Sequence, residues 1–297
     1  PELLALTASR VPDKDCFTIY EPDRVSLTYR QALEKVEAAA RKLRSIGIGR
    51  GDKVAVTGKN SPEWAVAYFA VLTAGAVVVP LDYQLPVAEL ANLIRAGDVC
   101  ALFVDEEKEA ELSAACPGLK AVFSLAAGRP GYVYGLDAPG APAFEKPAEG
   151  DLAAILFTSG TTGNPKGVML SHRNFVADCY LAQANLVVYS SDVFYALLPI
   201  HHAYTMLAVF IEAVSTGAEI VFAKRLVIKQ VLKDLKEARI TMFLGVPMLF
   251  NKVLAGIMRG VREKGALVYG VIRALMAVSG FIKKATGINP GKKLFHS

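Results

Sequence analysis

The stretch Leu152-Ala-Ala-Ile-Leu-Phe157, Thr158-Ser-Gly-Thr-Thr-Gly-Asn-Pro-Lys-Gly167, Val168-Met-Leu170 decides the fold class. Its first six residues are fully apolar, which is typical of a buried strand of a parallel sheet. The ten residues that follow hold three glycines, four hydroxyl side chains and one lysine. Asn164 and Pro165 favour a turn into a second short strand. The stretch therefore predicts a hairpin with a mobile, flap-like loop, followed by a helix that starts near Ser171.

Segments with helical periodicity alternate with short β-branched runs on both sides of this hairpin. Residues Thr28 to Gln31 have the spacing of a capping box, and apolar residues recur at helical intervals up to Gly47. Further helices are expected at 62–74, 86–96, 172–186, 203–216, 226–238 and 247–258, and strands at 53–57, 76–79, 99–104, 152–157, 193–197, 218–223 and 240–244. Such alternation predicts βαβ units, and hence an α/β protein with mixed, largely parallel sheets flanked by helices.

Residues 126–150 interrupt this alternation. They are rich in Gly, Pro and Ala, as is typical of a surface connection between subdomains. We therefore expect two abutting lobes, the first comprising residues 1–150 and the second residues 151–297. No internal repeat of fixed period is found, which excludes solenoids and propellers.

The composition is that of a folded protein, since 53% of the 297 residues are hydrophobic and 21% are charged. The four cysteines are scattered and form no Cys-x-x-Cys pair, so the sequence indicates neither a disulfide framework nor a thiolate zinc site, and a cytoplasmic location is expected. The uncharged run 64–81 contains a glycine and a proline, and Ser61-Pro62 ahead of it is typical of a helix start. This run is therefore interpreted as a buried helix and strand rather than a membrane span.

The net charge of +5 is unevenly distributed along the chain. Residues 1–150 hold 16 Lys and Arg against 20 Asp and Glu, whereas residues 151–297 hold 17 against 8. The second half should attract anions. Nucleic acid is not expected as a partner, because the basic residues are dispersed and no recognisable binding module is present. Converging backbone N–H groups, hydroxyls and Lys166 make the loop 158–167 a candidate polyphosphate cradle, although Thr and Gly also form ordinary surface turns.

The ten-residue loop resembles the signature of the adenylate-forming superfamily of acyl-CoA synthetases, nonribosomal adenylation domains and luciferases. It is not a Walker A loop, because Gly-x4-Gly-Lys-Ser/Thr does not fit it. Other segments are similar to the same family in the same order along the chain. They are Leu27-Thr-Tyr-Arg, Gly51-Asp-Lys-Val-Ala-Val, Asn60-Ser-Pro-Glu-Trp, Gly75-Ala-Val-Val-Val-Pro-Leu-Asp82, Leu198-Pro-Ile-His-His202 and Gly245-Val-Pro-Met-Leu249.

The resemblance implies a two-step reaction. A carboxylate attacks the α-phosphate of ATP and expels pyrophosphate, and the acyl-adenylate then transfers its acyl group to a thiol, usually that of coenzyme A. Mg²⁺ and oriented donors are needed because two anions must meet. The resemblance assigns the β- and γ-phosphates to Thr158, Ser159, Gly160, Thr161, Thr162, Gly163 and Lys166. It also implies that Thr158 contacts the magnesium ion.

Among the four histidines, His202 matches the motif histidine that the family places near the reacting carboxylate and α-phosphate. Tyr204 is close enough in sequence to line the same wall, and Gly245 and Val246 match the segment that helps to line the acyl pocket. His201 is expected to pack, because adjacent side chains of an extended segment point to opposite sides and chelate poorly. Motifs for covalent hydrolase chemistry are missing, including Gly-x-Ser-x-Gly and Ser-x-x-Lys.

The sequence departs from the family by stopping before its later motifs. It is therefore interpreted as the N-terminal portion of the large adenylation domain, without the small C-terminal domain and inactive on its own. Residues 259–297 carry eight Lys and Arg and one Glu, and the apolar residues Leu267, Val268, Val271, Ile272, Leu275 and Met276 recur at i, i+4 spacing. Such a basic amphipathic helix either packs on the core or lies peripherally on the inner face of an anionic membrane.

Taken together, the residues and the resemblance predict an ATP-dependent, Mg²⁺-requiring ligase that joins a medium- or long-chain fatty acid to coenzyme A. Two alternatives stay open. One is an enzyme that activates an aryl or amino acid for a carrier-protein thiol, and the other is a non-catalytic nucleotide-binding module.

Overall fold

The computed structural model describes residues 1–144, 146–158 and 165–286. The chain forms two compact units. The first comprises Pro1–Leu226 and Val231–Leu244, and the second comprises Val227–Gln230 and the chain from Gly245 onward.

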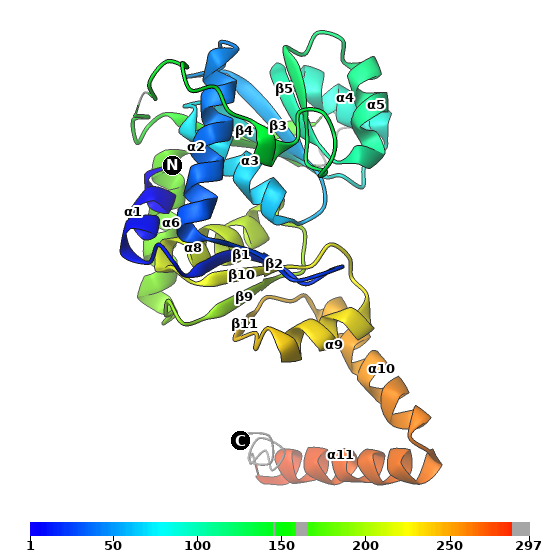
Figure 1. Ribbon diagram of the computed structural model, residues 1–297. Helices are drawn as coiled ribbons and strands as arrows, with labels where there is room; N and C mark the ends of the chain where they lie inside the picture. The colour runs from blue at the N-terminus through cyan, green and yellow to red at the C-terminus, as the bar shows by residue number, and fades with distance from the viewer. Residues whose placement is uncertain (145, 159–164, 287–297) are drawn as a thin grey trace. The chain divides into compact units, whose positions relative to one another are not determined.

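Two β-sheets form the framework of the first unit (Figure 1). The six-stranded sheet has the order β6-β5-β3-β4-β7-β8, and the five-stranded sheet has the order β11-β9-β10-β1-β2. The strands are β1 (Asp15–Ile19), β2 (Val25–Thr28), β3 (Lys53–Thr57), β4 (Val77–Leu81), β5 (Val99–Val104), β6 (Ala121–Ser124), β7 (Leu152–Thr158), β8 (Lys166–Ser171), β9 (Val193–Ala196), β10 (Glu219–Phe222) and β11 (Met242–Phe243). The pairs β1–β2 and β7–β8 are antiparallel and the other strand pairs are parallel. The expected α/β class with mixed, largely parallel sheets is confirmed.

The two sheets do not follow the expected division at residue 150. Strand β7, which comes after the connection 126–150, pairs with β4 through Val78 and Ala154. Strand β1, from the start of the chain, pairs with β10 through Phe17 and Ile220. The expected lobes 1–150 and 151–297 are therefore wrong as units of the fold. An apolar strand pairs wherever a complementary sheet edge is free, and a Gly- and Pro-rich connection only shows that the chain runs over the surface.

The helices and shorter turns of the first unit connect these strands. They are α1 (Glu2–Arg10), α2 (Tyr29–Ser45), α3 (Pro62–Thr73), α4 (Val87–Ala96), α5 (Glu106–Ala115), η1 (Val133–Gly135), α6 (His172–Asn185), α7 (Ala203–Thr205), η2 (Met206–Ile211) and α8 (Glu212–Thr216). Helix α9 (Ile228–Glu237) begins at residues of the second unit. The expected helix 203–216 contains a π-helical segment at η2, a local irregularity that is frequent near functional sites.

The helix starts follow the local sequence signals. Thr28 and Gln31 form the expected capping box at α2, and Ser61 caps α3 with Pro62 at its first position. Ten of the twelve residues of α3 are buried. This burial confirms that the apolar run 64–81 is a core helix followed by strand β4.

The main core fills the space between the two sheets, around α3 and α2. Phe210 lies at its centre, with ring centroids 5.2 Å from Phe69, 5.3 Å from Tyr68 and 5.7 Å from Trp64. A second, smaller core covers the other face of the six-stranded sheet, beneath α4 and α5. Strand β3 alternates between the two cores, with Val54 and Val56 facing the first and Ala55 the second. Burial on both faces explains why these strands are continuous apolar runs.

The helices that follow β3 and β4 pack on opposite faces of the six-stranded sheet. Helix α3 belongs to the main core and α4 to the smaller one. The chain therefore reverses its winding between these two adjacent parallel strands. In open α/β sheets, ligands bind outside the carboxyl ends of the strands at such a reversal. This edge is where functional side chains are expected.

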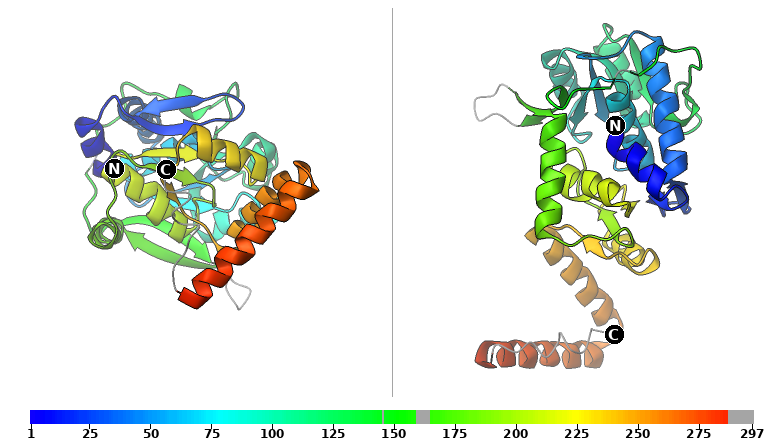
Figure 2. Two further views of the ribbon diagram at one scale, coloured as in Figure 1. Left: turned by 90° about the horizontal axis from the view of Figure 1, so that it is seen from below. Right: turned by 90° about the vertical axis from the view of Figure 1, so that its left-hand side faces the viewer.

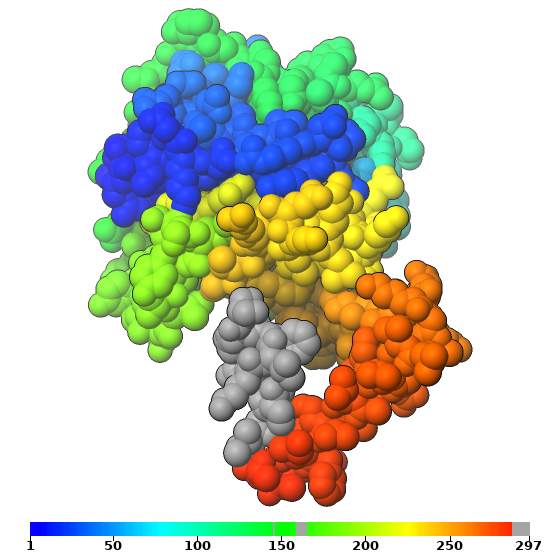
Figure 3. Space-filling model, turned by 60° about the horizontal axis from the view of Figure 1, so that its bottom comes forward, coloured from blue at the N-terminus to red at the C-terminus, as the bar shows by residue number. Residues whose placement is uncertain are grey.

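The second unit contains α10 (Pro247–Glu263) and α11 (Ala266–Thr286). Helix α10 continues five residues beyond the expected end at residue 258. No residue of α11 is buried. One face of this helix is seen in orange to red in Figure 3.

Candidate functional site at the carboxyl ends of the strands

Three strands of the six-stranded sheet end at the same edge and have polar residues at or shortly after their carboxyl ends. Asn60 lies in the turn after β3, Asp82 follows β4, and Thr158 ends β7. Strands β3, β4 and β7 are mutually parallel, so their carboxyl ends share one edge. The turn after β9, which holds His201 and His202, is joined to this edge by hydrogen bonds from Asn60.

The expected phosphate loop joins two antiparallel strands at the sheet edge, β7 and β8 (Figure 2). Thr158 pairs with Lys166 in the strand register, and its hydroxyl donates to the Lys166 carbonyl oxygen at 3.4 Å. Both residues are exposed, and Lys166 makes no ion pair with any residue that the structure describes. The expected phosphate-binding residues Ser159, Gly160, Thr161, Thr162 and Gly163 lie outside the described residues.

Gly167 is required for the close approach of the two hairpin strands. A Cβ atom at this position would lie 2.8 Å from Cγ2 of Ile155 and 3.5 Å from the ring of Phe157. Because glycine has no side chain, β8 can pair closely with β7 at this position, and this pairing places Thr158 opposite Lys166. The expected hairpin is thereby confirmed, with β8 beginning at Lys166 rather than Val168.

The buried side chain of Asn60 holds the turn that contains the histidines. Its Nδ2 donates to the carbonyl oxygens of Ala196 and Leu198, both at 2.9 Å, and its Oδ1 accepts from the Ile200 N–H at 3.1 Å. These bonds connect the loop after β3 in one sheet with the segment after β9 in the other. Asn60 therefore positions the start of the His201-His202 turn.

His201 and His202 lie side by side, which corrects the expectation that they point to opposite sides. Their ring centroids are 4.2 Å apart, because the segment is a turn that leads into α7 rather than an extended strand. His201 is buried as expected, whereas His202 is exposed. Burial, together with the neighbouring His202, lowers the pKa of His201 below its usual range, while Asp82 acts in the opposite direction. His201 is therefore neutral at pH 7.

Asp82 completes a cluster with the two histidines. Its Oδ1 lies 3.7 Å from Nε2 of His201 and accepts a hydrogen bond from the Gln84 N–H at 2.9 Å. The Nε2 atom of His201 is buried and has no hydrogen-bond partner among the described residues. One ligand atom from each of the three residues lies within 4.8 Å of the others. Two imidazoles and one carboxylate suit Zn²⁺ better than Mg²⁺, which prefers oxygen ligands.

Asp105, after β5, fixes the loop on the other side of Asn60. Its Oδ2 accepts from the Lys59 N–H at 2.8 Å. Burial raises the pKa of the Asp105 carboxyl to about 6, and this hydrogen bond acts in the opposite direction. Lys59 in turn pairs with Glu107 at 2.6 Å.

The remaining expected site residues are distributed over both units. Tyr204 is in α7 and is 60% exposed, so its ring is accessible to a ligand. Gly245 and Val246 belong to the second unit, where Val246 precedes α10. A Cβ atom at Gly245 would lie 2.7 Å from the ring of Phe250, so this position requires the close approach that glycine permits.

Sequence reasoning did not assign roles to Asn60, Asp82 and Asp105. Each of the three follows the last residues of a predicted parallel strand. Their position directly after the apolar runs was the available signal, since the carboxyl ends of parallel strands meet at one edge.

Comparisons with known proteins agree on one family. A family model described as AMP-binding enzyme matches residues 4–285. Long chain acyl-CoA synthetase 4 of Arabidopsis thaliana is 29% identical over 296 residues, covering 90% of this chain and 44% of the relative. Feruloyl-CoA synthase of an Amycolatopsis species is 30% identical over 233 residues, covering 77% of this chain and 45% of the relative. The chain thus spans less than half the length of these curated relatives.

A solved structure agrees with these sequence matches. The ATP-bound structure of MatB from Rhodopseudomonas palustris superimposes with a TM-score of 0.73 at 27% identity, covering 85% of this chain and 50% of that one.

Proposed function

The chain belongs to the AMP-binding enzyme family, and on this premise we propose that the protein activates a medium- or long-chain fatty acid with ATP and transfers the acyl group to coenzyme A. In the first step the carboxylate oxygen bonds to the α-phosphorus of ATP, and the bond to pyrophosphate breaks. In the second step the thiol of coenzyme A loses its proton to solvent and its sulfur bonds to the acyl carbon, while the bond from that carbon to the phosphate oxygen breaks and AMP leaves. The similarity to a long chain acyl-CoA synthetase supports a fatty acid as the substrate.

The observation that carries this proposal is the β7–β8 hairpin, which places Thr158 and Lys166 opposite each other at the carboxyl end of β7. Lys166 is exposed at the base of a loop with three glycines and four hydroxyls, and no described acid neutralises it. A lysine ammonium group that pairs with no described acid, at the base of a loop whose sequence is rich in hydroxyls and glycines, fits the β- and γ-phosphates of ATP. We assign the phosphates to Thr158, Ser159, Gly160, Thr161, Thr162, Gly163 and Lys166.

Thr158 is also the residue proposed to contact Mg²⁺. Its hydroxyl is exposed and oxygen is the ligand that Mg²⁺ prefers, so the residue fits the ion. When bound, Mg²⁺ would neutralise charge on the phosphates of ATP.

His202 is proposed to face the reacting carboxylate and the α-phosphate. Its ring is exposed, whereas its neighbour His201 is buried, neutral and next to Asp82. Contact between the two rings and the hydrogen bonds of Asn60 restrict where His202 can lie. Such restriction lowers the entropic cost of orienting a substrate. Tyr204, Gly245 and Val246 are proposed to contact the organic acid.

A second candidate substrate class is an aryl acid, which the similarity to feruloyl-CoA synthase favours. The four free cysteines Cys16, Cys100, Cys116 and Cys179 support a cytoplasmic location, which is part of the proposal.

Assays of coenzyme A thioester formation by the full natural protein test the substrate class. The protein should convert palmitate with a kcat/KM at least tenfold above that for ferulate, benzoate or an amino acid. Preference for ferulate would select the aryl alternative, and no thioester with any acid would refute both.

The variant Lys166→Ala tests the phosphate site in the same assay. Loss of one charge-assisted contact should lower kcat/KM for ATP about 10- to 100-fold. The matched control is Lys146→Ala, which removes another exposed lysine, one that pairs with Glu2. It should leave the kinetics unchanged. Equal kinetics for the two variants would contradict the assignment of Lys166.

A further inference from the structure

Helix α11 presents an apolar face that no described residue covers. Its 21 residues give a length of about 32 Å. Five large side chains on it are between 56% and 86% exposed, namely Leu267, Val271, Leu275, Val278 and Phe281. Helix α11 is long and apolar enough to cross a membrane by length and composition, and none of its residues is buried.

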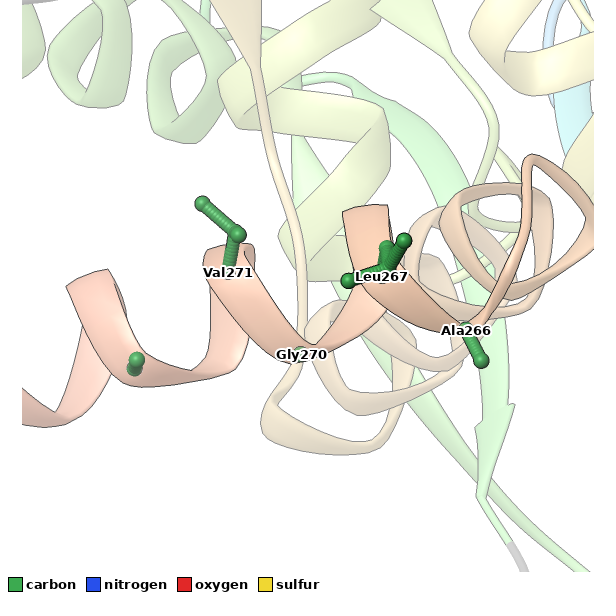
Figure 4. A pocket seen from close by; sticks show the side chains of 5 residues that line it. Ala266, Leu267, Gly270 and Val271 are labelled. Atoms are coloured by element: carbon green, nitrogen blue, oxygen red, sulfur yellow. The ribbon is translucent and has the colours of Figure 1, made fainter.

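Five of the seven large apolar residues that are exposed on α11 lie on one side of the helix, Val268 lies beside them, and Met276 lies on the other side. At 100° per residue, the five positions fall within an arc of about 120°. Leu267 and Val271 project from the same side of the helix in Figure 4. A shallow recess is lined by these two residues together with the small residues Ala266, Gly270 and Ala274, with no polar side chain among its described lining. This surface, the five large residues named above, is called the apolar face.

The cations of α11 lie on the opposite side. Arg273, Lys283 and Lys284 fall about 120° to 140° from the centre of the apolar face. The guanidinium groups of Arg262 and Arg273 lie 5.9 Å and 6.0 Å from the ring centre of Tyr269, which keeps both charges on the polar side. An amphipathic helix with this pattern lies along a membrane surface, with its apolar side chains among the acyl chains and its cations at the headgroups.

The net positive charge of α10 and α11 indicates that a membrane bound by α11 is anionic. Residues 245–286 hold seven Lys and Arg and one Glu. A second copy of the chain would bring the same positive charge to the contact, whereas an anionic lipid surface is complementary to it. Arg273 near the middle of α11 disfavours a transmembrane orientation, because it would place a charge within the hydrocarbon.

We propose that α11 docks in the plane of an anionic bilayer and holds the protein at the membrane surface. The inference is independent of the catalytic assignment, because it rests on the apolar face and the charge of the second unit. Together with the proposed function, it would place an enzyme that activates fatty acids at the bilayer in which fatty acids dissolve.

Co-sedimentation of the full natural protein with vesicles tests the proposal. The protein should bind vesicles of phosphatidylglycerol and phosphatidylcholine and bind phosphatidylcholine alone at least tenfold more weakly. High salt should release it, because part of the attraction is electrostatic. Binding to neither vesicle, or equal binding to both, would overturn the proposal.

Two variants separate the apolar face from general surface hydrophobicity. Val271→Ser with Leu275→Ser should lower the partition coefficient at least tenfold. The control is Val176→Ser with Leu181→Ser on α6, whose side chains are 64% and 59% exposed, against 57% and 63% for Val271 and Leu275. The control should bind as the parent does, and circular dichroism should show that both variants are folded.

Charge reversal and oligomeric state complete the test. Lys283→Glu with Lys284→Glu should weaken binding to anionic vesicles and leave binding to phosphatidylcholine unchanged. Retained binding in this variant or in Val271→Ser with Leu275→Ser would overturn the proposal. A dimer that dissociates in the latter variant without any change in vesicle binding would show that a second copy covers the apolar face.

Discussion

Replacing Asn60 with alanine tests whether this side chain holds the histidine turn. The substitution removes two donors that bind the Ala196 and Leu198 carbonyl oxygens and one acceptor that binds the Ile200 N–H. Asn60 is 7% exposed, so water cannot freely replace these bonds. The two sheets would lose a direct polar link next to the proposed site.

The expected cost follows from the three hydrogen bonds. At about 0.5 to 1.5 kcal/mol each, the free energy of unfolding should fall by about 3 kcal/mol. For a unit of this size, such a loss lowers Tm by about 6 to 12 °C. Because the same bonds position the turn of His202, kcat/KM should fall about 10- to 100-fold even at temperatures where the variant is folded.

Urea unfolding followed by circular dichroism measures the first quantity, and thioester formation by the full natural protein measures the second. The control is Asn185→Ala, since Asn185 is exposed and, among the described residues, its Nδ2 donates only to the Leu181 carbonyl oxygen within the same helix. It should change the free energy of unfolding by less than about 0.5 kcal/mol. A similarly small change in Asn60→Ala would refute the role of Asn60 as a clamp.

Three further variants test other parts of the account. Burial raises the pKa of Asp105 to about 6, so the folded state keeps this proton between pH 4 and 6 while the unfolded chain releases it, and stability falls as pH rises through that window. Urea titrations between pH 4 and 6 should show that the free energy of unfolding of Asp105→Asn falls by about 1 to 2 kcal/mol less than that of the parent. The same pH dependence in both proteins would contradict the raised pKa of Asp105. Tyr195→Phe removes the hydroxyl 2.7 Å from buried Asp234 and should cost about 1 to 2 kcal/mol in urea unfolding, whereas an unchanged midpoint would show that this bond is not needed. Gly167→Val should open the hairpin by contact with Ile155, seen as faster hydrogen exchange in β8, and unchanged exchange would mean that the strands accommodate the side chain.

Local features were predictable because their causes are local. The caps at Thr28 and Ser61, the buried helix α3 and the hairpin β7–β8 all follow from residues within a few positions of one another. A capping box or a glycine-rich turn acts on the backbone that contains it. The class of the fold follows from the alternation of such elements.

The pairing of distant strands was not predictable in the same way. Nothing in Phe17 itself indicates that its strand pairs with Ile220, more than two hundred residues later. Likewise, the connection at 126–150 changes composition without separating the two sheets, since Ala154 pairs back with Val78. Register between distant strands depends on the complementarity of whole sheet faces, which a local pattern does not contain.

In the candidate site, too, the local features were predictable from the sequence and the contacts between distant segments were not. The loop 158–167 and His202 could be selected by their residue types and by resemblance. The neighbouring rings of His201 and His202 could not, because the turn after β9 is shaped by Asn60 from another sheet. Asp82 joins these rings only after β4 and β9 are placed.

Exchange of labelled pyrophosphate into ATP tests the central claim most directly, because it reports the reversal of acid adenylation alone. With the full natural protein and Mg²⁺, label should enter ATP only when a fatty acid is present, and Lys166→Ala should reduce the exchange at least tenfold. Exchange that proceeds equally without any acid, or no exchange with fatty, aryl or amino acids, would contradict the account.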